Sequence, residues 1–275
     1  MKRAIVITLA LTILAGITDL RAWSVKGHML VGYVADQHLT PEARKACHHY
    51  LRHTLSYYGS WLDQVRYTED YRQTQRWHAS SVDARTGKYI NTGSGAALNI
   101  MRIQSEMEDG RYRSLSDSAI IDNIKSLIHM VGDMHCPSHV SFRNAKGMDL
   151  RQAFKVKGKI KTRDYVIRGK TIRHHGFWDG SPALFHPDWR VEEFGKACDR
   201  VSKREATKLQ QGTPIDWLEE AATRVRISYL PHGTVFEELP QEQQQALIEL
   251  CDSQIVRAGH RLAHILNTIF AISNL

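Results

Sequence analysis

Apolar residues recur at helical spacing along most of the chain. Between Ser114 and His135, Ile120, Ile121, Ile124, Leu127, Ile128 and Val131 are separated by the intervals that place side chains on one helical face. Thr40-Pro41-Glu42 combines an N-cap, a first-turn proline and an acidic first-turn residue, which predicts a helix from Pro41 to about Leu55. Further helices are predicted from Ser24 toward His38 and over about 191–209, 214–229 and 241–270.

One segment alternates instead of following the helical period. In residues 154–173, Lys155, Lys157, Lys159, Lys161 and Arg163 alternate with apolar or small residues. Alternation of this kind predicts a β-hairpin with one basic face. Such a face would either follow a phosphate backbone or stand solvated at the surface.

The fold class that follows is mainly α, in a single domain with a small β-hairpin insertion. No Pro/Gly/Ser-rich linker divides the chain, and 42% hydrophobic residues over 275 positions suffice for a folded core, which excludes intrinsic disorder. The formal charge of +8 indicates an anionic partner, such as nucleic acid or a phosphate-bearing substrate.

The first residues have the order of a secretory signal peptide. Met1-Lys2-Arg3 is positive, the segment 4–17 is apolar, and polar character returns before Ala22. Cleavage after Ala22 would leave a catalytic domain of residues 23–275, secreted or periplasmic and without stable membrane association; an uncleaved anchor is the lesser interpretation because the apolar run is short. In an oxidising compartment the four cysteines, Cys47, Cys136, Cys198 and Cys251, would form two disulfides or remain buried thiols.

The chain has 15 histidines, and two of them stand four residues before an aspartate. His129 and Asp133 fall within the apolar helix, and His175 and Asp179 repeat the spacing, which places both side chains of a pair on one face. A single pair of this kind is usually an ordinary hydrogen bond. Two pairs, with His139 following the first, favour a metal site.

Three short segments precede the two His-x-x-x-Asp pairs along the chain. They are Trp23-Ser24-Val25-Lys26-Gly27-His28, Ser60-Trp61-Leu62-Asp63-Gln64-Val65-Arg66 and Arg76-Trp77-His78. Together with the two His-x-x-x-Asp pairs, this ordered set resembles the S1/P1 nucleases. These are secreted, mostly helical zinc enzymes that cut single-stranded nucleic acids and remove 3′-phosphates.

The resemblance implies a trinuclear zinc cluster and assigns ligands to it. Asp63, His78, His129 and Asp133 would hold one zinc ion; the amine and carbonyl oxygen of Trp23, with His28, would hold a second that shares Asp133; His139, His175 and Asp179 would hold the third. Arg66 would bind substrate phosphate or, alternatively, form a salt bridge to a ligating carboxylate. His135 matches a family histidine that is not a ligand, and His38, His48, His49, His53, His186, His232, His260 and His264 match no ligand position.

Several features depart from the family pattern. Ala79 and Ser80 stand where an aromatic residue often holds a base, and the connection from His139 to His175 is longer than usual. The absence of an Asn-x-Ser/Thr sequon favours a bacterial setting. A zinc phospholipase C, which shares the N-terminal tryptophan and the cluster, and a catalytically silent binder of zinc or nucleic acid are the competing functions.

Overall fold

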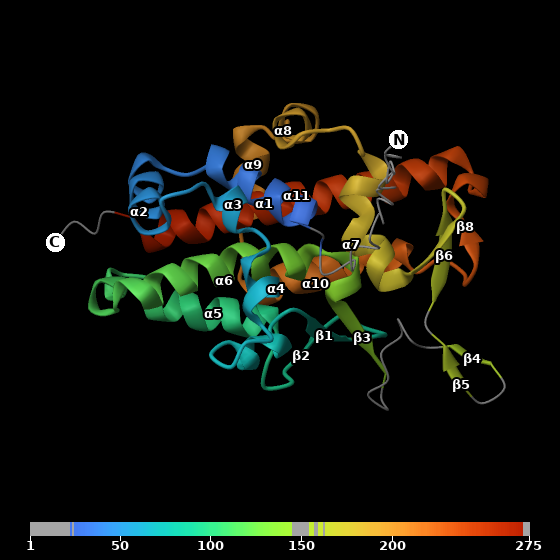
Figure 1. Ribbon diagram of the computed structural model, residues 1–275, viewed down its shortest axis with the longest axis horizontal. Coiled ribbons are helices and arrows are strands. Elements are labelled where there is room, and N and C mark those ends of the chain that lie inside the picture. Colours follow the sequence, from blue (N-terminus) through green and yellow to red (C-terminus); the bar gives the residue numbers. More distant parts are fainter. Residues whose placement is uncertain (1–22, 24, 145–153, 157–158, 162, 272–275) are drawn as a thin grey trace, which may run out of the picture.

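The computed structural model describes residues 23, 25–144, 154–156, 159–161 and 163–271, so the predicted signal peptide lies outside the described residues. The protein is mostly helical (Figure 1), as the sequence predicts. The long helix α11 (Gln241–Ile269) packs against α1 (Val25–Gln37) and α6 (Asp117–His135), and α5 (Ala96–Met107) packs against α6. These contacts bury the apolar faces that the sequence spacing indicates.

Short elements surround this centre. The helical ones are α2 (Pro41–Leu51), α3 (Leu55–Tyr58), α4 (Trp61–Val65), η1 (Arg72–Arg76), η2 (Arg111–Ser114), η3 (Pro137–His139), α7 (His174–Phe185), α8 (Val191–Cys198), α9 (Lys203–Gln210), α10 (Pro214–Arg224), η5 (Val225–Ser228) and η6 (Phe236–Glu238). The strands are β1 (Ser80–Asp83), β2 (Tyr89–Ile90), β3 (Val140–Arg143), β4 (Phe154–Val156), β5 (Lys159–Lys161), β6 (Asp164–Ile167), β7 (Lys170–Arg173) and β8 (Thr234–Val235).

Capping residues fix the start of α2, where the sequence places it, and the start of α6, which begins at Asp117 and not at the predicted Ser114. The Thr40 side chain accepts a hydrogen bond from the Ala43 backbone, and Ser116 does the same for Ala119 at the start of α6. The end of α2 differs from the prediction. Arg52 adopts a left-handed conformation (φ 63°), which terminates the helix before the predicted Leu55.

The helix predicted over 191–209 is wrong as a single element. The structure has α8 and α9, separated by Asp199–Val201 and by Ser202, whose side chain caps α9 through the Glu205 backbone. Because Ser202 and Glu205 form a reciprocal capping box, a new helix begins there instead of continuing the first. Asp199 is thereby left at the C-terminal end of α8.

Residues 154–173 form two antiparallel strand pairs where the sequence predicts one hairpin. Strand β4 pairs with β5, and β6 pairs with β7, both antiparallel. Arg168 (φ 51°) and Gly169 (φ 70°) form the turn between β6 and β7, and two consecutive positive φ angles suit a tight two-residue hairpin. For Lys155, Lys159 and Lys161 the structure describes the strands but not the side chains, and Lys157 lies outside the described residues.

A small sheet that the sequence pattern does not predict positions two of the site histidines. Strand β1 runs parallel to β3 with Ser80 opposite Val140, and β2 pairs with the other side of β1. His78 stands two residues before Ser80 and His139 directly before Val140. The pairing therefore brings the two histidines, far apart in sequence, to the same end of the sheet.

The described helices and cysteines bear on membrane association and on disulfide formation. None of the described helices is long and apolar enough to cross a bilayer. All four cysteines are free thiols in the described structure, and Cys47, Cys136 and Cys251 are buried. The structure therefore has four free thiols, three of them buried and Cys198 partly buried, and not the two disulfides.

Candidate metal centre

Eight of the predicted ligands converge at the end of the sheet from six parts of the chain. Helix α1 contributes His28, α4 Asp63, the turn before β1 His78, α6 His129 and Asp133, η3 His139, and α7 His175 and Asp179. All are buried except His175, whose side chain is 51% exposed. The structure therefore gathers side chains spread over more than half of the chain.

Asp133 lies at the centre of these residues. Its Oδ2 atom is 2.9 Å from His78 Nδ1 and 3.2 Å from His129 Nε2. Its Oδ1 atom is 3.4 Å from His28 Nε2 and 3.7 Å from His139 Nδ1. One carboxylate thus faces two groups of histidines through different oxygens, an arrangement suited to a ligand shared by two cations.

Asp63 approaches the same group from α4. Its Oδ1 atom lies 3.7 Å from His78 Nδ1 and 3.8 Å from His129 Nε2. Arg66, one helical turn later, places Nη1 3.0 Å from the same oxygen. The salt bridge that the sequence leaves as the alternative role of Arg66 is therefore present in the structure.

Asp179 organises the third group. Its Oδ2 is 2.8 Å from His175 Nδ1, and its Oδ1 is 3.5 Å from His139 Nε2. The Ser138 hydroxyl donates to Asp179 Oδ1 at 2.6 Å, and Cys136 Sγ lies 3.7 Å from that oxygen. Sequence reasoning did not identify Ser138 or Cys136 as part of the site, because only the fold brings η3 against α7.

Hydrogen bonds to backbone carbonyls orient two of the rings. His129 Nδ1 donates to the Gly59 carbonyl at 2.8 Å, and His139 Nδ1 donates to the His78 carbonyl at 2.6 Å. Each bond places the ring proton on Nδ1 and leaves the Nε2 lone pair facing the carboxylates. This is the second hydrogen bond that metal-binding histidines typically make.

The electrostatics of the cluster are those of a cation site. Burial lowers the pKa of His28 and lowers that of His78 to about 4. Burial would also lower the pKa of His139, but Asp133 and Asp179 raise it to about 9. Three buried carboxylates need positive charge nearby, and among the described residues protonated histidines and Arg66 supply it when no metal ion is bound.

Several buried ligand atoms have no hydrogen-bond partner among the described residues. They are His28 Nε2, His78 Nε2, Asp133 Oδ1 and His139 Nε2. Leaving such atoms unsatisfied in the interior costs about 1–3 kcal/mol each. Imidazole nitrogens and carboxylate oxygens without thiolate are a typical catalytic zinc donor set, so these residues fit the metal.

The tightest groups differ in part from the predicted ligand sets. Atoms within 4.8 Å of one another form the groups His28–His129–Asp133, Asp63–His78–His129 and Cys136–His139–Asp179. His129 thus belongs to two groups. Cys136 stands in the third group where the resemblance assigns His175.

Trp23 and His135 occupy distinct positions. Trp23 is fully buried, and a Cβ on Gly27 would lie 3.0 Å from its Cγ, so the glycine lets α1 pack against the indole. His135 points away from the cluster, since Nδ1 donates to the Val131 carbonyl at 2.7 Å and Nε2 accepts from Arg261 at 2.8 Å. His135 is therefore held as part of the packing between α6 and α11.

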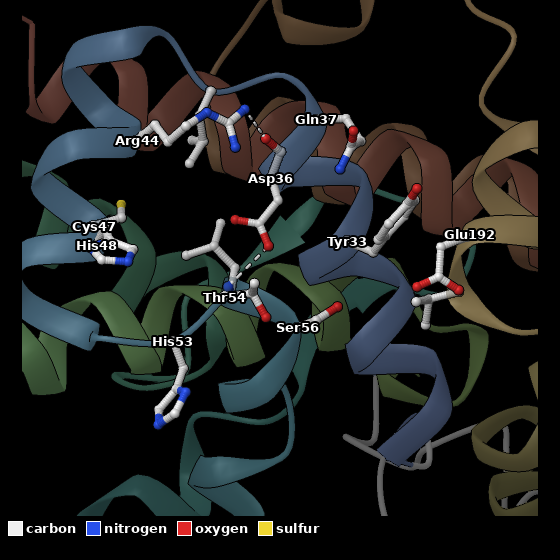
Figure 2. A pocket seen from close by; sticks show the side chains of 13 residues that line it. Tyr33, Asp36, Gln37, Arg44, Cys47, His48, His53, Thr54, Ser56 and Glu192 are labelled. Carbon is white, nitrogen blue, oxygen red and sulfur yellow. Dashed lines mark hydrogen bonds between the residues drawn. The ribbon is translucent and has the colours of Figure 1, made fainter.

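A separate cavity of about 380 Å³ contains none of the predicted ligands (Figure 2). Residues of α1, α2 and α3, of the connection between α2 and α3, and of the start of α8 line it, among them Asp36, Arg44 and His53.

Comparisons with known proteins agree with the geometry. The family model described as S1/P1 Nuclease matches residues 23–271. Nuclease P1 of Penicillium citrinum is 23% identical over 90% of this chain and 97% of its own length. Nuclease S1 of Aspergillus oryzae is 23% identical over 98% of both chains, and endonuclease 1 of Arabidopsis thaliana is 22% identical over 97% of this chain and 93% of its own. The chain belongs to the S1/P1 nuclease family.

Proposed function

We propose that the protein is a secreted zinc-dependent phosphodiesterase that hydrolyses single-stranded DNA or RNA to products with 5′-phosphates, and that it also removes the phosphate of 3′-nucleotides. The observation that carries the proposal is Asp133, whose two oxygens face His28 on one side and His78 and His129 on the other. Family membership adds a nuclease as the class of enzyme.

Three zinc ions per chain are proposed for the cluster. Asp63, His78, His129 and Asp133 would hold one, Trp23 and His28 with Asp133 a second, and His139, His175 and Asp179 a third. Zinc bound there would supply Lewis-acid stabilisation of phosphate charge and acidify water for attack. The buried, unpartnered ligand atoms support this assignment.

The residues themselves would bind and orient the substrate. Arg66 is partly exposed, with 15% of its side chain accessible, and could bind a phosphate oxygen from its place beside Asp63. Ser138 holds Asp179 Oδ1, which keeps the other oxygen directed at His175. The full sequence has a net charge of +8, of which the proposed signal peptide carries +2, and the basic excess that remains supports an anionic substrate.

The site of action is part of the same proposal. Residues 1–22 are proposed as a signal peptide and 23–275 as the catalytic domain, which would act in the periplasm or outside the cell. The match of the family model from residue 23 onward agrees with this division.

The test uses purified protein trimmed to begin at Trp23 and loaded with zinc. It is incubated with single-stranded DNA, a 3′-nucleotide and phosphatidylcholine, each with and without a chelator. Chelator-sensitive cleavage of DNA to 5′-phosphate ends is expected. Asp133→Asn should abolish cleavage, whereas His49→Gln, which changes an exposed histidine on α2, should not. Products with 3′-phosphates, or hydrolysis of phosphatidylcholine alone, would contradict the proposal.

A further inference from the structure

A second His–Asp–His group lies outside the predicted cluster. His38 directly follows α1, Asp199 caps the end of α8, and His260 lies on α11. His38 Nε2 is 2.7 Å from Asp199 Oδ2, and His260 Nε2 is 2.9 Å from Asp199 Oδ1. Three remote segments therefore direct nitrogen and oxygen donors to one point, as the ligands of the catalytic centre do.

The spacing matches that of the predicted zinc ligands. The three donor atoms lie within 4.8 Å of one another. In the catalytic centre the corresponding nitrogen-to-oxygen distances are 2.9 Å for His78 and Asp133 and 2.8 Å for His175 and Asp179. The rings of His38 and His260 lie with centroids 4.0 Å apart, so both nitrogens reach the same carboxylate from one side.

The backbone around each donor is fixed. Asn267 on α11 donates its amide to the His38 carbonyl at 3.0 Å and accepts from the Thr40 backbone at 2.8 Å. The Asp199 backbone donates to the Gly195 carbonyl at 3.0 Å. His260 is fully buried on its helix. A ligand set held this way needs little reorganisation to bind an ion.

Charge and access also suit a cation. Burial would raise the pKa of Asp199, but hydrogen bonds from His260 and His38 hold it well below its usual range, so the carboxylate is ionised at neutral pH. The Asp199 side chain is only 8% exposed, and a carboxylate buried to this degree needs a positively charged partner. His38 is 33% exposed and leaves one side of the group open to water.

We propose that His38, Asp199 and His260 bind one divalent transition-metal ion, zinc in preference, at a site separate from the catalytic cluster. Two imidazoles and one carboxylate match the donor set of known zinc sites and leave a coordination position for water. Calcium and magnesium prefer all-oxygen ligands and are not expected there.

The site would stabilise the fold and take no part in hydrolysis. Helix α1 separates His38 from His28 by ten residues, about 15 Å along the helix axis at 1.5 Å per residue. An ion at His38 would join the end of α1 to α11 and to the break between α8 and α9. Binding to the folded state alone raises the unfolding temperature in proportion to the logarithm of the free ion concentration.

The first test compares zinc content in four versions of the trimmed protein, loaded with zinc and then desalted. His38→Gln keeps an N–H donor for Asp199 but removes the imidazole, and Asp199→Asn removes the charge. His264→Gln is the matched control, since it changes a histidine one turn beyond His260 that belongs to none of the groups. Wild type and H264Q should hold one zinc ion more per chain than H38Q and D199N. All four should cleave single-stranded DNA alike.

Equal zinc content in all four proteins would overturn the proposal and leave His38–Asp199–His260 as a hydrogen-bonded contact only. A second measurement covers variants that fail to fold. Crystals of zinc-loaded wild-type protein should give an anomalous scattering peak at the zinc edge between the three side chains, and a map without that peak would also overturn it. Neither result depends on nuclease activity, so failure here is distinguishable from failure of the proposed function.

Discussion

A Cβ atom on Gly132 would lie 2.8 Å from His28 Nδ1, so α6 makes room for the His28 imidazole at this position. The same ring stacks on His129 with centroids 3.9 Å apart. Helix α1 can therefore deliver His28 to Asp133 only because the residue before Asp133 has no side chain.

Gly132→Ala should displace His28 and damage the centre. In an unobstructed helix this substitution would add up to about 1 kcal/mol of stability. Here the His28 ring must shift, and misplacing a group by about 1 Å costs on the order of 100-fold in rate. Single-stranded DNA cleavage and zinc content should both fall while circular dichroism is unchanged. Full activity with a higher unfolding temperature would show that the His28 ring accommodates the added methyl group without being displaced.

Local signals explain which parts of the fold were predictable. The helices α2 and α6 begin directly after Thr40 and Ser116, where a capping side chain and the apolar period are adjacent in sequence. The parallel pairing of β1 with β3 joins strands of four residues each, about sixty positions apart, and no local pattern encodes it. The break after α8 was missed because its cause, the Ser202–Glu205 capping box, stands inside a continuous helical period.

The same distinction applies to the site. The ligands from His28 to Asp179 could be proposed because their order along the chain resembles a family. His38 and His260 carry no such order, and their relation to Asp199 exists only once α1, α8 and α11 are packed together. Gly132 and Ser138 likewise gain their roles from contacts between elements.

Arg66 can be tested for its two possible roles. Because Nη1 lies 3.0 Å from Asp63 Oδ1, the guanidinium would either hold that ligand or bind substrate phosphate. Removing one group that stabilises transition-state charge costs about 100-fold or more in kcat. Arg66→Gln should therefore reduce kcat by about 100-fold at unchanged zinc content, and Arg66→Lys should reduce it less. A loss of zinc that accounts for the lost activity would instead assign Arg66 to holding Asp63.

Tyr67 is the candidate for the base-stacking role that Ala79 cannot fill. Its side chain is 61% exposed, and the Arg66 guanidinium lies 5.0 Å from the ring centroid. Stacking of a base on an aromatic ring is worth about 1–3 kcal/mol. Tyr67→Ala should raise KM for single-stranded DNA about tenfold, which corresponds to 1.4 kcal/mol. Tyr57→Ala is the control, since Tyr57 is similarly exposed but stacks on His53. Equal KM in both variants would exclude Tyr67 from binding.

Asp36 should make stability depend on pH. Figure 2 shows its carboxylate in the cavity, where one oxygen accepts a hydrogen bond from the Leu55 backbone at 3.0 Å. Burial raises the pKa of Asp36 to about 6. Because folding raises this pKa, the folded state binds the Asp36 proton more tightly than the unfolded state does. The contribution of protonated Asp36 to the free energy of unfolding is therefore present at low pH and is lost as the pH rises through about 6.

Asp36→Asn removes this titration and keeps an oxygen acceptor for Leu55. The difference in unfolding free energy, variant minus wild type, should be about 1 kcal/mol more favourable to the variant at pH 8 than at pH 5. Chemical denaturation of both proteins at the two pH values measures the difference. A difference between the proteins that does not change with pH would show that Asp36 does not titrate in this range.

The last prediction concerns the Trp23 amine, and its reason lies in the chemistry of the peptide bond. In an uncleaved chain the Trp23 nitrogen is an amide, whose lone pair is delocalised into the preceding carbonyl and binds zinc poorly. Cleavage after Ala22 would turn it into an amine with an ordinary pKa of about 7.7–8.0, which can bind a metal once its proton leaves. The buried indole against Gly27 fixes Trp23 near the start of α1, five residues from His28.

Activity should therefore depend on a precise N-terminus. A protein that begins at Trp23 is compared with one carrying a single extra glycine, both at saturating zinc. The extended protein should fold normally, because the Trp23 side chain is unchanged, but it should lose most turnover and hold less zinc. Since His28 and Asp133 remain in both proteins, the difference isolates the amine. Equal turnover at equal zinc content would remove the N-terminus from the mechanism and leave His28 and Asp133 as the ligands of that ion.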